Sequence, residues 1–135
     1  MKKNGFTLLE LLVVIGIIGI LVALATVSYS ATQRSARDSK RKQDLVAIQN
    51  SLEQYYSQAS YVYPTGSCTV AVNQMSSAWP VDPLTAANYS GVSGCTATTY
   101  CICALMEKNT AGNSSSAACS YSTATTTYYC VSNLQ

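Results

Sequence analysis

The chain opens with Met1-Lys2-Lys3-Asn4-Gly5-Phe6-Thr7-Leu8-Leu9-Glu10 and continues through 23 uncharged residues, 11–33. Residues 11–25 of this run are nearly all aliphatic. As an α-helix rising ~1.5 Å per residue, the run is long enough to cross a hydrocarbon core of ~30 Å. No proline occurs before Pro64, so nothing forces the helix to end at a membrane surface. The sequence therefore predicts a membrane-spanning helix that continues beyond the bilayer.

The pattern after residue 40 is amphipathic. Apolar residues recur at three- and four-residue steps, which is the spacing of one helical face: Leu45, Ile48, Leu52, Tyr55 and Ala59. Polar residues such as Gln49 and Glu53 occupy the other side. We therefore predict one continuous helix from about Phe6 to about Gln58, apolar all round in its first half and with one buried face in its second half.

Short β-prone runs follow the helix, at residues 68–72, 100–105 and 125–131. A turn cluster at 61–66, a proline-containing loop at 79–83 and a Gly/Asn/Ser-rich segment at 109–116 separate them. We expect the last two strands to form a hairpin, and a small antiparallel sheet to cover the apolar stripe of the helix. The predicted fold class is α+β, with a long N-terminal helix packed on that sheet.

All six cysteines lie in the second half of the chain: Cys68, Cys95, Cys101, Cys103, Cys119 and Cys130. An even number in a small Ser/Thr-rich region favours disulfides and an oxidising compartment outside the cytoplasm. The alternatives are a zinc site and free thiols. Zinc sites usually contain CxxC pairs, whereas the close pair here, Cys101 and Cys103, has a single intervening residue.

The charge pattern excludes several functions. The net charge is +2 and 10% of residues are charged, so no electrostatic footprint for nucleic acid is present. Five of the eight basic residues, at positions 34, 37, 40, 41 and 42, follow the apolar run directly, as at a membrane boundary. The chain contains no histidine and no acidic pair in sequence beyond the start of the helix, so no acid/base or nucleophilic constellation can be assembled. We expect no enzyme activity, catalytic residues, cofactor or metal.

The opening segment Gly5-Phe6-Thr7-Leu8-Leu9-Glu10-Leu11-Leu12-Val13-Val14 resembles the prepilin cleavage and methylation signal of type IV pilins and of the pseudopilins of type II secretion and DNA uptake. The resemblance implies that a prepilin peptidase cuts between Gly5 and Phe6, and that the new Phe6 is N-methylated. It divides the chain into a leader (1–5), a membrane and filament-core half of the helix (6–33), an amphipathic half (34–60) and a disulfide-stapled β domain (61–135). Its partners would be copies of itself, other pilins, the inner membrane and the assembly platform.

Glu10 is an acid at the edge of an apolar run, where burial in a bilayer costs ~2.5–3.5 kcal/mol by insertion scales. Such a residue is functional by default and needs a partner. The new amino group of Phe6 is the best candidate at that depth. The resemblance implies that Glu10 of one subunit meets Phe6 of its neighbour and sets the axial register. The alternative is a partnerless acid that snorkels to the membrane interface.

A weaker resemblance extends further. The segment 44–48 with Tyr63-Pro64 is similar to the helix and helix exit of the major pseudopilin of type II secretion, and Asp82-Pro83 to that group's Asp-Pro loop. Leu84-Thr85 replaces the expected Trp-Gly, and Asp82 is the only carboxylate between Glu53 and Glu107, so a calcium site is not expected. Cys119 and Cys130 are similar to the pair that closes the C-terminal loop of many pilins, which favours that pairing. Cys68–Cys95 is a second guess among 15 possible connectivities.

Two other readings of the N-terminus remain open. The apolar core 11–24, with Ala23-Leu24-Ala25 at its end, resembles a cleaved secretory signal, although Glu10 would interrupt its start. A plain anchor holding a monomeric binding domain is the other alternative. Five basic residues follow the predicted span and two precede it, and this excess of positive charge by itself would place the C-terminal part in the cytoplasm. The cysteines and the leader instead place the C-terminal part outside. We expect a single-pass bacterial membrane protein with an extracytoplasmic domain, later part of a pilus, a secretion pseudopilus or a DNA-uptake pilus.

Overall fold

The computed structural model describes residues 5–124 and 126–135, without the side chains of residues 27 and 28. Leader residues Met1 to Asn4 and Thr125, the first residue of the third predicted strand, lie outside the described residues. The element order is α1 (Leu8–Gln58), η1 (Cys68–Gln74), η2 (Val92–Gly94), β1 (Cys101–Leu105) and β2 (Tyr128–Ser132). The fold is therefore α+β, as predicted. It divides into two compact units, one ending at Gln33 and one from Arg34 to Gln135, which we call the globular unit.

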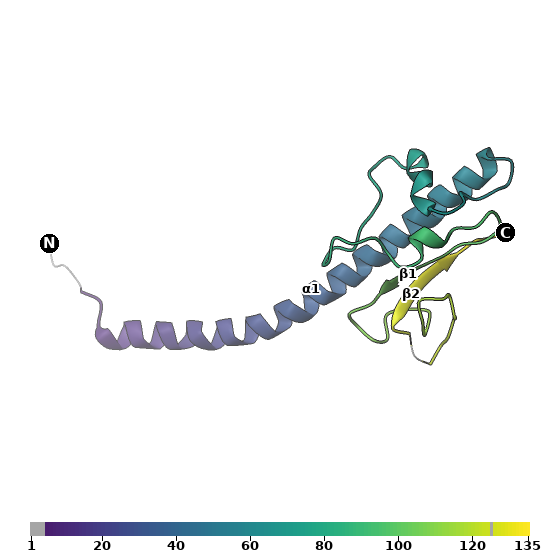
Figure 1. The fold of residues 1–135 in the computed structure, drawn as a ribbon. Coiled ribbons are helices and arrows are strands. Elements are labelled where there is room, and N and C mark those ends of the chain that lie inside the picture. The colour runs from purple at the N-terminus through teal and green to yellow at the C-terminus, as the bar shows by residue number, and fades with distance from the viewer. Residues whose placement is uncertain (1–4, 125) are drawn as a thin grey trace. The chain divides into compact units, whose positions relative to one another are not determined.

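Helix α1 runs from Leu8 to Gln58, within two residues of the predicted bounds (Figure 1). By length and composition, it is apolar enough in its first part to cross a membrane. The described chain then leaves the helix through Ser60 and Tyr61, which have positive φ angles of 55° and 63°. That reversal returns the chain toward the apolar face of α1.

The sheet consists of β1 and β2, which pair antiparallel and lie beside the second half of α1 in Figure 1. Ile102 faces Val131 and Cys103 faces Cys130 across the ladder. Both predicted strands are confirmed to within a few residues, and so is their antiparallel pairing. The connection between them is a long folded segment whose backbone bonds to Tyr128, through Asn113 and Ser114.

The core of the globular unit lies between α1 and the sheet. Three residues of the predicted helical stripe, Leu45, Ile48 and Leu52, are fully buried. They pack against a cluster contributed by the loops and strands: Tyr63, Cys68, Ala71, Tyr89, Val92, Cys95, Tyr100, Ile102, Ala104, Met106 and Val131.

The predicted strand at 68–72 is wrong, because this segment forms the 3₁₀ helix η1. The side chain of Ser67 accepts a hydrogen bond from the N–H of Thr69, which favours a turn over an extended strand. Cys68 and Ala71 are both buried, at the three-residue spacing of a 3₁₀ helix. The burial of Cys68 in the core therefore outweighs the β-propensity of this segment.

Gly91 allows the close approach between the segment before η2 and the first strand. Its φ is +89°, and a Cβ there would overlap the carbonyl oxygen of Cys101. The neighbouring Ser90 exchanges two backbone hydrogen bonds with Cys103, at 3.0 and 2.9 Å. A glycine is therefore required where this loop joins the outer edge of β1.

Candidate assembly segment and charged cluster

The predicted processing residues lie just before α1. Gly5 to Thr7 precede the helix, which begins at Leu8, and the side chain of Phe6 is 83% exposed. The Gly5–Phe6 peptide bond is therefore on an exposed, non-helical stretch next to a helix start. This is a geometry that a peptidase can reach.

Thr7 and Glu10 form a reciprocal cap at the start of α1. A Glu10 carboxylate oxygen accepts hydrogen bonds from the N–H of Thr7 at 2.9 Å and from its hydroxyl at 2.8 Å. The Thr7 hydroxyl in turn accepts from the N–H of Glu10 at 3.2 Å. This is the capping-box arrangement, which satisfies helix N–H groups that otherwise have no partner. The Thr-x-x-Glu spacing of Thr7 and Glu10 is the sequence signature of this cap, a role that the predicted pairing with Phe6 does not include.

The predicted pairing of Glu10 with the amine of Phe6 stays a prediction. In the intact chain the Phe6 nitrogen belongs to a peptide bond and carries no charge. Cleavage after Gly5 would create the amine. Glu10 would then have two possible donors, Thr7 of its own chain and Phe6.

The apolar side chains of the first unit have no cover from the chain itself. Every described large apolar side chain between Leu8 and Leu24 is at least 48% exposed. Such a continuous apolar surface is far larger than a soluble monomer normally shows and marks contact with lipid or with other protein. Lipid or another protein chain is therefore needed to cover the apolar surface of this segment.

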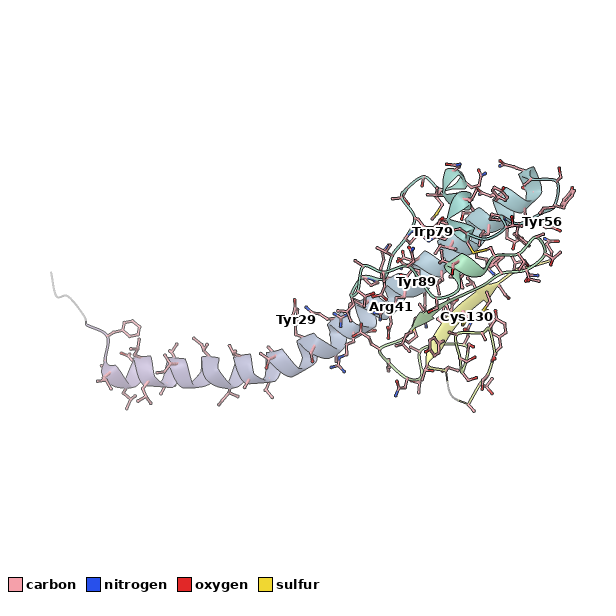
Figure 2. The ribbon with its side chains drawn as sticks, viewed as in Figure 1. Tyr29, Arg41, Tyr56, Trp79, Tyr89 and Cys130 are labelled. Atoms are coloured by element: carbon pink, nitrogen blue, oxygen red, sulfur yellow. A yellow bond between two sulfur atoms is a disulfide. The ribbon has the colours of Figure 1, made fainter. Side chains whose placement is uncertain are left out.

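The globular unit contains a charged cluster around Arg41, which lies on the buried stripe of α1 one turn before Leu45 (Figure 2). Its Nε donates to Asp82 at 2.6 Å, and its Nη1 donates to Asp38 at 2.8 Å and to Glu107 at 3.0 Å. Arg37 adds two bonds of 2.6 Å to Glu107. The cluster therefore ties α1 to the loop at residue 82 and to the end of β1.

The ionisation of the cluster reflects these bonds. Burial raises the pKa of Asp82, but hydrogen bonds from Arg41 and from the N–H groups of Thr85 and Leu84 outweigh it and lower the pKa to about 2. The hydrogen bonds from Arg37 are the largest cause that lowers the pKa of Glu107 to about 2. Burial lowers the pKa of Arg41, but its carboxylate partners raise it overall. All three groups are charged at neutral pH.

Asp82 uses its carboxylate inside this cluster. One oxygen accepts the N–H groups of Leu84 and Thr85, both at 2.9 Å, and the other accepts from Arg41. A guanidinium therefore occupies the side of Asp82 that faces α1. Among the described residues, the group whose donor atoms come within metal-binding reach is Cys101, Cys103 and Cys119, and each of them is in a disulfide.

Residues 1–26 match the family model described as the prokaryotic N-terminal methylation motif. Over 64 residues, 47% of the chain, the sequence is 41% identical to the type II secretion system core protein G of Escherichia coli (strain K12), covering 43% of that protein. The Vibrio cholerae core protein G gives the same identity and coverage. The type IV major pilin protein PilA of Myxococcus xanthus is 35% identical over 57 residues, covering 26% of its length. The chain thus spans less than half the length of these curated relatives.

In its N-terminal part, this chain is similar to type II secretion core protein G and to a type IV pilin. The similarity includes the N-terminal methylation motif, which overlaps the apolar start of α1. No solved structure gives a significant match to the chain. The globular unit must therefore be understood from its own residues.

Three disulfides cross-link the globular unit: Cys68–Cys95, Cys101–Cys119 and Cys103–Cys130. The predicted Cys68–Cys95 pair is confirmed. The favoured Cys119–Cys130 pair is wrong, because Cys103 lies directly opposite Cys130 in the antiparallel register, with their Cα atoms 4.1 Å apart. Cys119 then pairs with Cys101, two residues earlier on β1.

Glu53, near the C-terminal end of α1, links the helix to three other segments of the globular unit. Its carboxylate accepts the hydroxyls of Tyr63 and Tyr100, each at 2.9 Å, and the N–H of Leu134 at 3.2 Å. Asp44 accepts the hydroxyl of Tyr89 at 2.8 Å in the same way. Burial, followed by the bond to the carboxylate, raises the pKa of each of these three buried phenols, Tyr63, Tyr89 and Tyr100. Tyr63, Tyr89 and Tyr100 are therefore core residues that also bond to carboxylates.

Proposed function

We propose that this chain is a structural subunit of a type IV pilus-like filament, and not an enzyme. The observation that carries the proposal is the methylation motif placed at the start of a long apolar helix whose side chains are uncovered. A prepilin peptidase cuts between Gly5 and Phe6, and Phe6 is then N-methylated. The mature chain assembles with copies of itself and with other pilins through that helix.

The four segments act in succession. Residues 1–5 are the processing leader, and residues 6–33 anchor the subunit in the bacterial inner membrane until they become the filament core. Residues 34–60 join that segment to the extracytoplasmic domain, 61–135. The three disulfides support an oxidising location for the domain. The assembly platform in the membrane is the expected site at which the subunit passes from the bilayer into the filament.

Glu10 is the assembly residue to test. Glu10→Ala removes the carboxylate that would meet a neighbour's Phe6 amine, and the loss of a charge favours the apolar helix in the bilayer. The variant should accumulate in the membrane at wild-type level, while filaments recovered by shearing fall to a small fraction. Thr26→Ala is the matched control, because it removes a hydroxyl from the same helix that donates to the Ala23 carbonyl of its own chain. Normal filaments from Glu10→Ala would remove the role proposed for Glu10.

A secretion pseudopilus is the more favoured filament within this class. The similarity to core protein G is higher and longer than the similarity to the PilA pilin, 41% over 64 residues against 35% over 57. Deleting the chain from its host should then abolish export of secreted proteins while leaving surface pili intact. Loss of pili with normal export would assign the chain to a pilus instead.

A further inference from the structure

Most charged side chains of the globular unit bond to one another, and a few cations do not. Each of its acidic side chains accepts hydrogen bonds from within the unit: Asp38, Asp44, Glu53, Asp82 and Glu107. Three of its cations, Arg37, Lys40 and Arg41, donate to these carboxylates. The basic cluster that the sequence assigned to a membrane boundary is therefore mostly used to hold the fold together.

The other cations are Arg34, Lys42 and Lys108. Lys42 lies over the ring of Tyr129, 5.4 Å from its centroid. Arg34 and Lys108 are exposed, and within the described part of the chain their side chains have no hydrogen bond or ion pair. Both lie beside Asp38: Arg34 is one helical turn before it, and the N–H of Lys108 donates to its carboxylate at 3.0 Å. We call Arg34 and Lys108 the basal pair.

The position of Arg34 along α1 matches the headgroup layer of a bilayer. A hydrocarbon core of ~30 Å takes about 20 helical residues, which from Leu8 extends to residue 27. Tyr29 follows and is 66% exposed, as is typical of aromatic residues at a membrane interface (Figure 2). Arg34 follows five residues later in the sequence, and its long side chain can reach back to phosphate groups.

A second copy of the chain is a poor partner for the basal pair. The globular unit of a neighbour offers the same five carboxylates, each already bonded within its own unit. Lipid phosphates beside the membrane-spanning segment are anionic and adjacent. Arginine and lysine bind them with strong charge-assisted hydrogen bonds.

We propose that Arg34 and Lys108 bind the headgroups of anionic phospholipids while the subunit resides in the membrane. The inference rests on the membrane stage of the proposed function. The bound lipids hold the base of the globular unit at the membrane surface. Incorporation into a filament removes the subunit from the bilayer, so these contacts must break on assembly. The charge of the lipids therefore contributes to the free-energy barrier for leaving the membrane.

The test uses the full chain in nanodiscs that contain equal amounts of phosphatidylcholine and phosphatidylglycerol. Native mass spectrometry measures which lipids stay bound when the chain is released. We expect retained lipid to be enriched in phosphatidylglycerol, and Arg34→Gln and Lys108→Gln each to lower that enrichment about fivefold. Lys42→Gln removes the same charge elsewhere on the unit and should change the enrichment less than about twofold. The emission of Trp79, the only tryptophan, verifies that each variant is folded.

Each other outcome contradicts part of the account. No enrichment in the wild type, or an equal loss in Lys42→Gln, would overturn the basal pair as a lipid site. Displacement of the lipid by millimolar inorganic phosphate would identify a site for free phosphate instead. A chain that enters neither neutral nor anionic bilayers would contradict the membrane stage itself, which separates failure of the proposed function from failure of this inference.

Discussion

Arg41→Met is the perturbation that most directly tests how the second half of α1 is held to the rest of the globular unit. Methionine fills much of the arginine volume but leaves Asp38, Asp82 and Glu107 without the bonds of 2.8, 2.6 and 3.0 Å that Arg41 supplies. Breaking one side of a buried ion pair costs about 3–5 kcal/mol. Each carboxylate keeps other donors, so we expect the free energy of unfolding at pH 7 to fall by about 3 kcal/mol, the lower end of that range.

The loss of unfolding free energy in Arg41→Met should become smaller as the pH falls. The folded-state pKa values of Asp82 and Glu107, both about 2, lie below their ordinary values of 3.8 and 4.5. Their ionisation therefore stabilises the fold fully above about pH 5, and this stabilisation is lost as the pH falls toward 2. The wild type should lose stability across that window, and Arg41→Met should lose less. The difference between the two proteins should shrink between pH 7 and pH 3.

The assay is urea unfolding of the full chain in a neutral detergent, followed by Trp79 emission at both pH values. Urea leaves the ionic strength unchanged, so the cluster is not screened during the titration. Lys42→Met is the control, since it removes an adjacent cation that lies over Tyr129, and should cost at most about 1 kcal/mol. A loss below about 1 kcal/mol for Arg41→Met, or an equal loss at pH 7 and pH 3, would refute the reasoning.

The remaining predictions concern the rest of the globular unit. Stability should fall as the pH rises above about 10, because the three buried phenols have raised folded-state pKa values and ionise more readily when unfolded; a flat urea midpoint between pH 9 and pH 11.5 would contradict this. Replacing Cys68 and Cys95 together by serine should cost about 3.5 kcal/mol for a 27-residue loop, measured by urea unfolding without reductant, and a cost below 1 kcal/mol would argue against that pair. Gly91→Ala should lower the melting temperature by several degrees, because the new Cβ meets the carbonyl of Cys101, whereas the open, negative-φ Gly94→Ala should change it little.

The sequence predicted the helix, the methylation motif and the two strands because their signals are local. The apolar run and the steps from Leu45 to Leu52 determine a helix and its buried face without reference to distant residues. The methylation motif is likewise read within ten residues. The segment after Ser67 was assigned wrongly because its β-propensity is weaker than the local hydroxyl cap and the burial of Cys68.

The charged cluster and the cysteine pairing could not be read in the same way. Arg41 meets Asp82 and Glu107, which lie 41 and 66 residues away. A hint was present, since Arg41 falls on the apolar stripe four residues before Leu45, where a charge is expected only if it is paired. The disulfides depend on the register between β1 and β2, which places Cys103 opposite Cys130. Sequence spacing contains no information on that register.

The N-terminal residue of the mature protein, determined by mass spectrometry of the chain purified from its host membrane, tests the central claim most directly. The account predicts a chain that begins at N-methylated Phe6, with the leader 1–5 removed. A chain beginning at Thr26 would show a cleaved secretory signal and a secreted domain without its helix core. An intact Met1 would show a plain membrane anchor, and either result would contradict the assignment as a filament subunit.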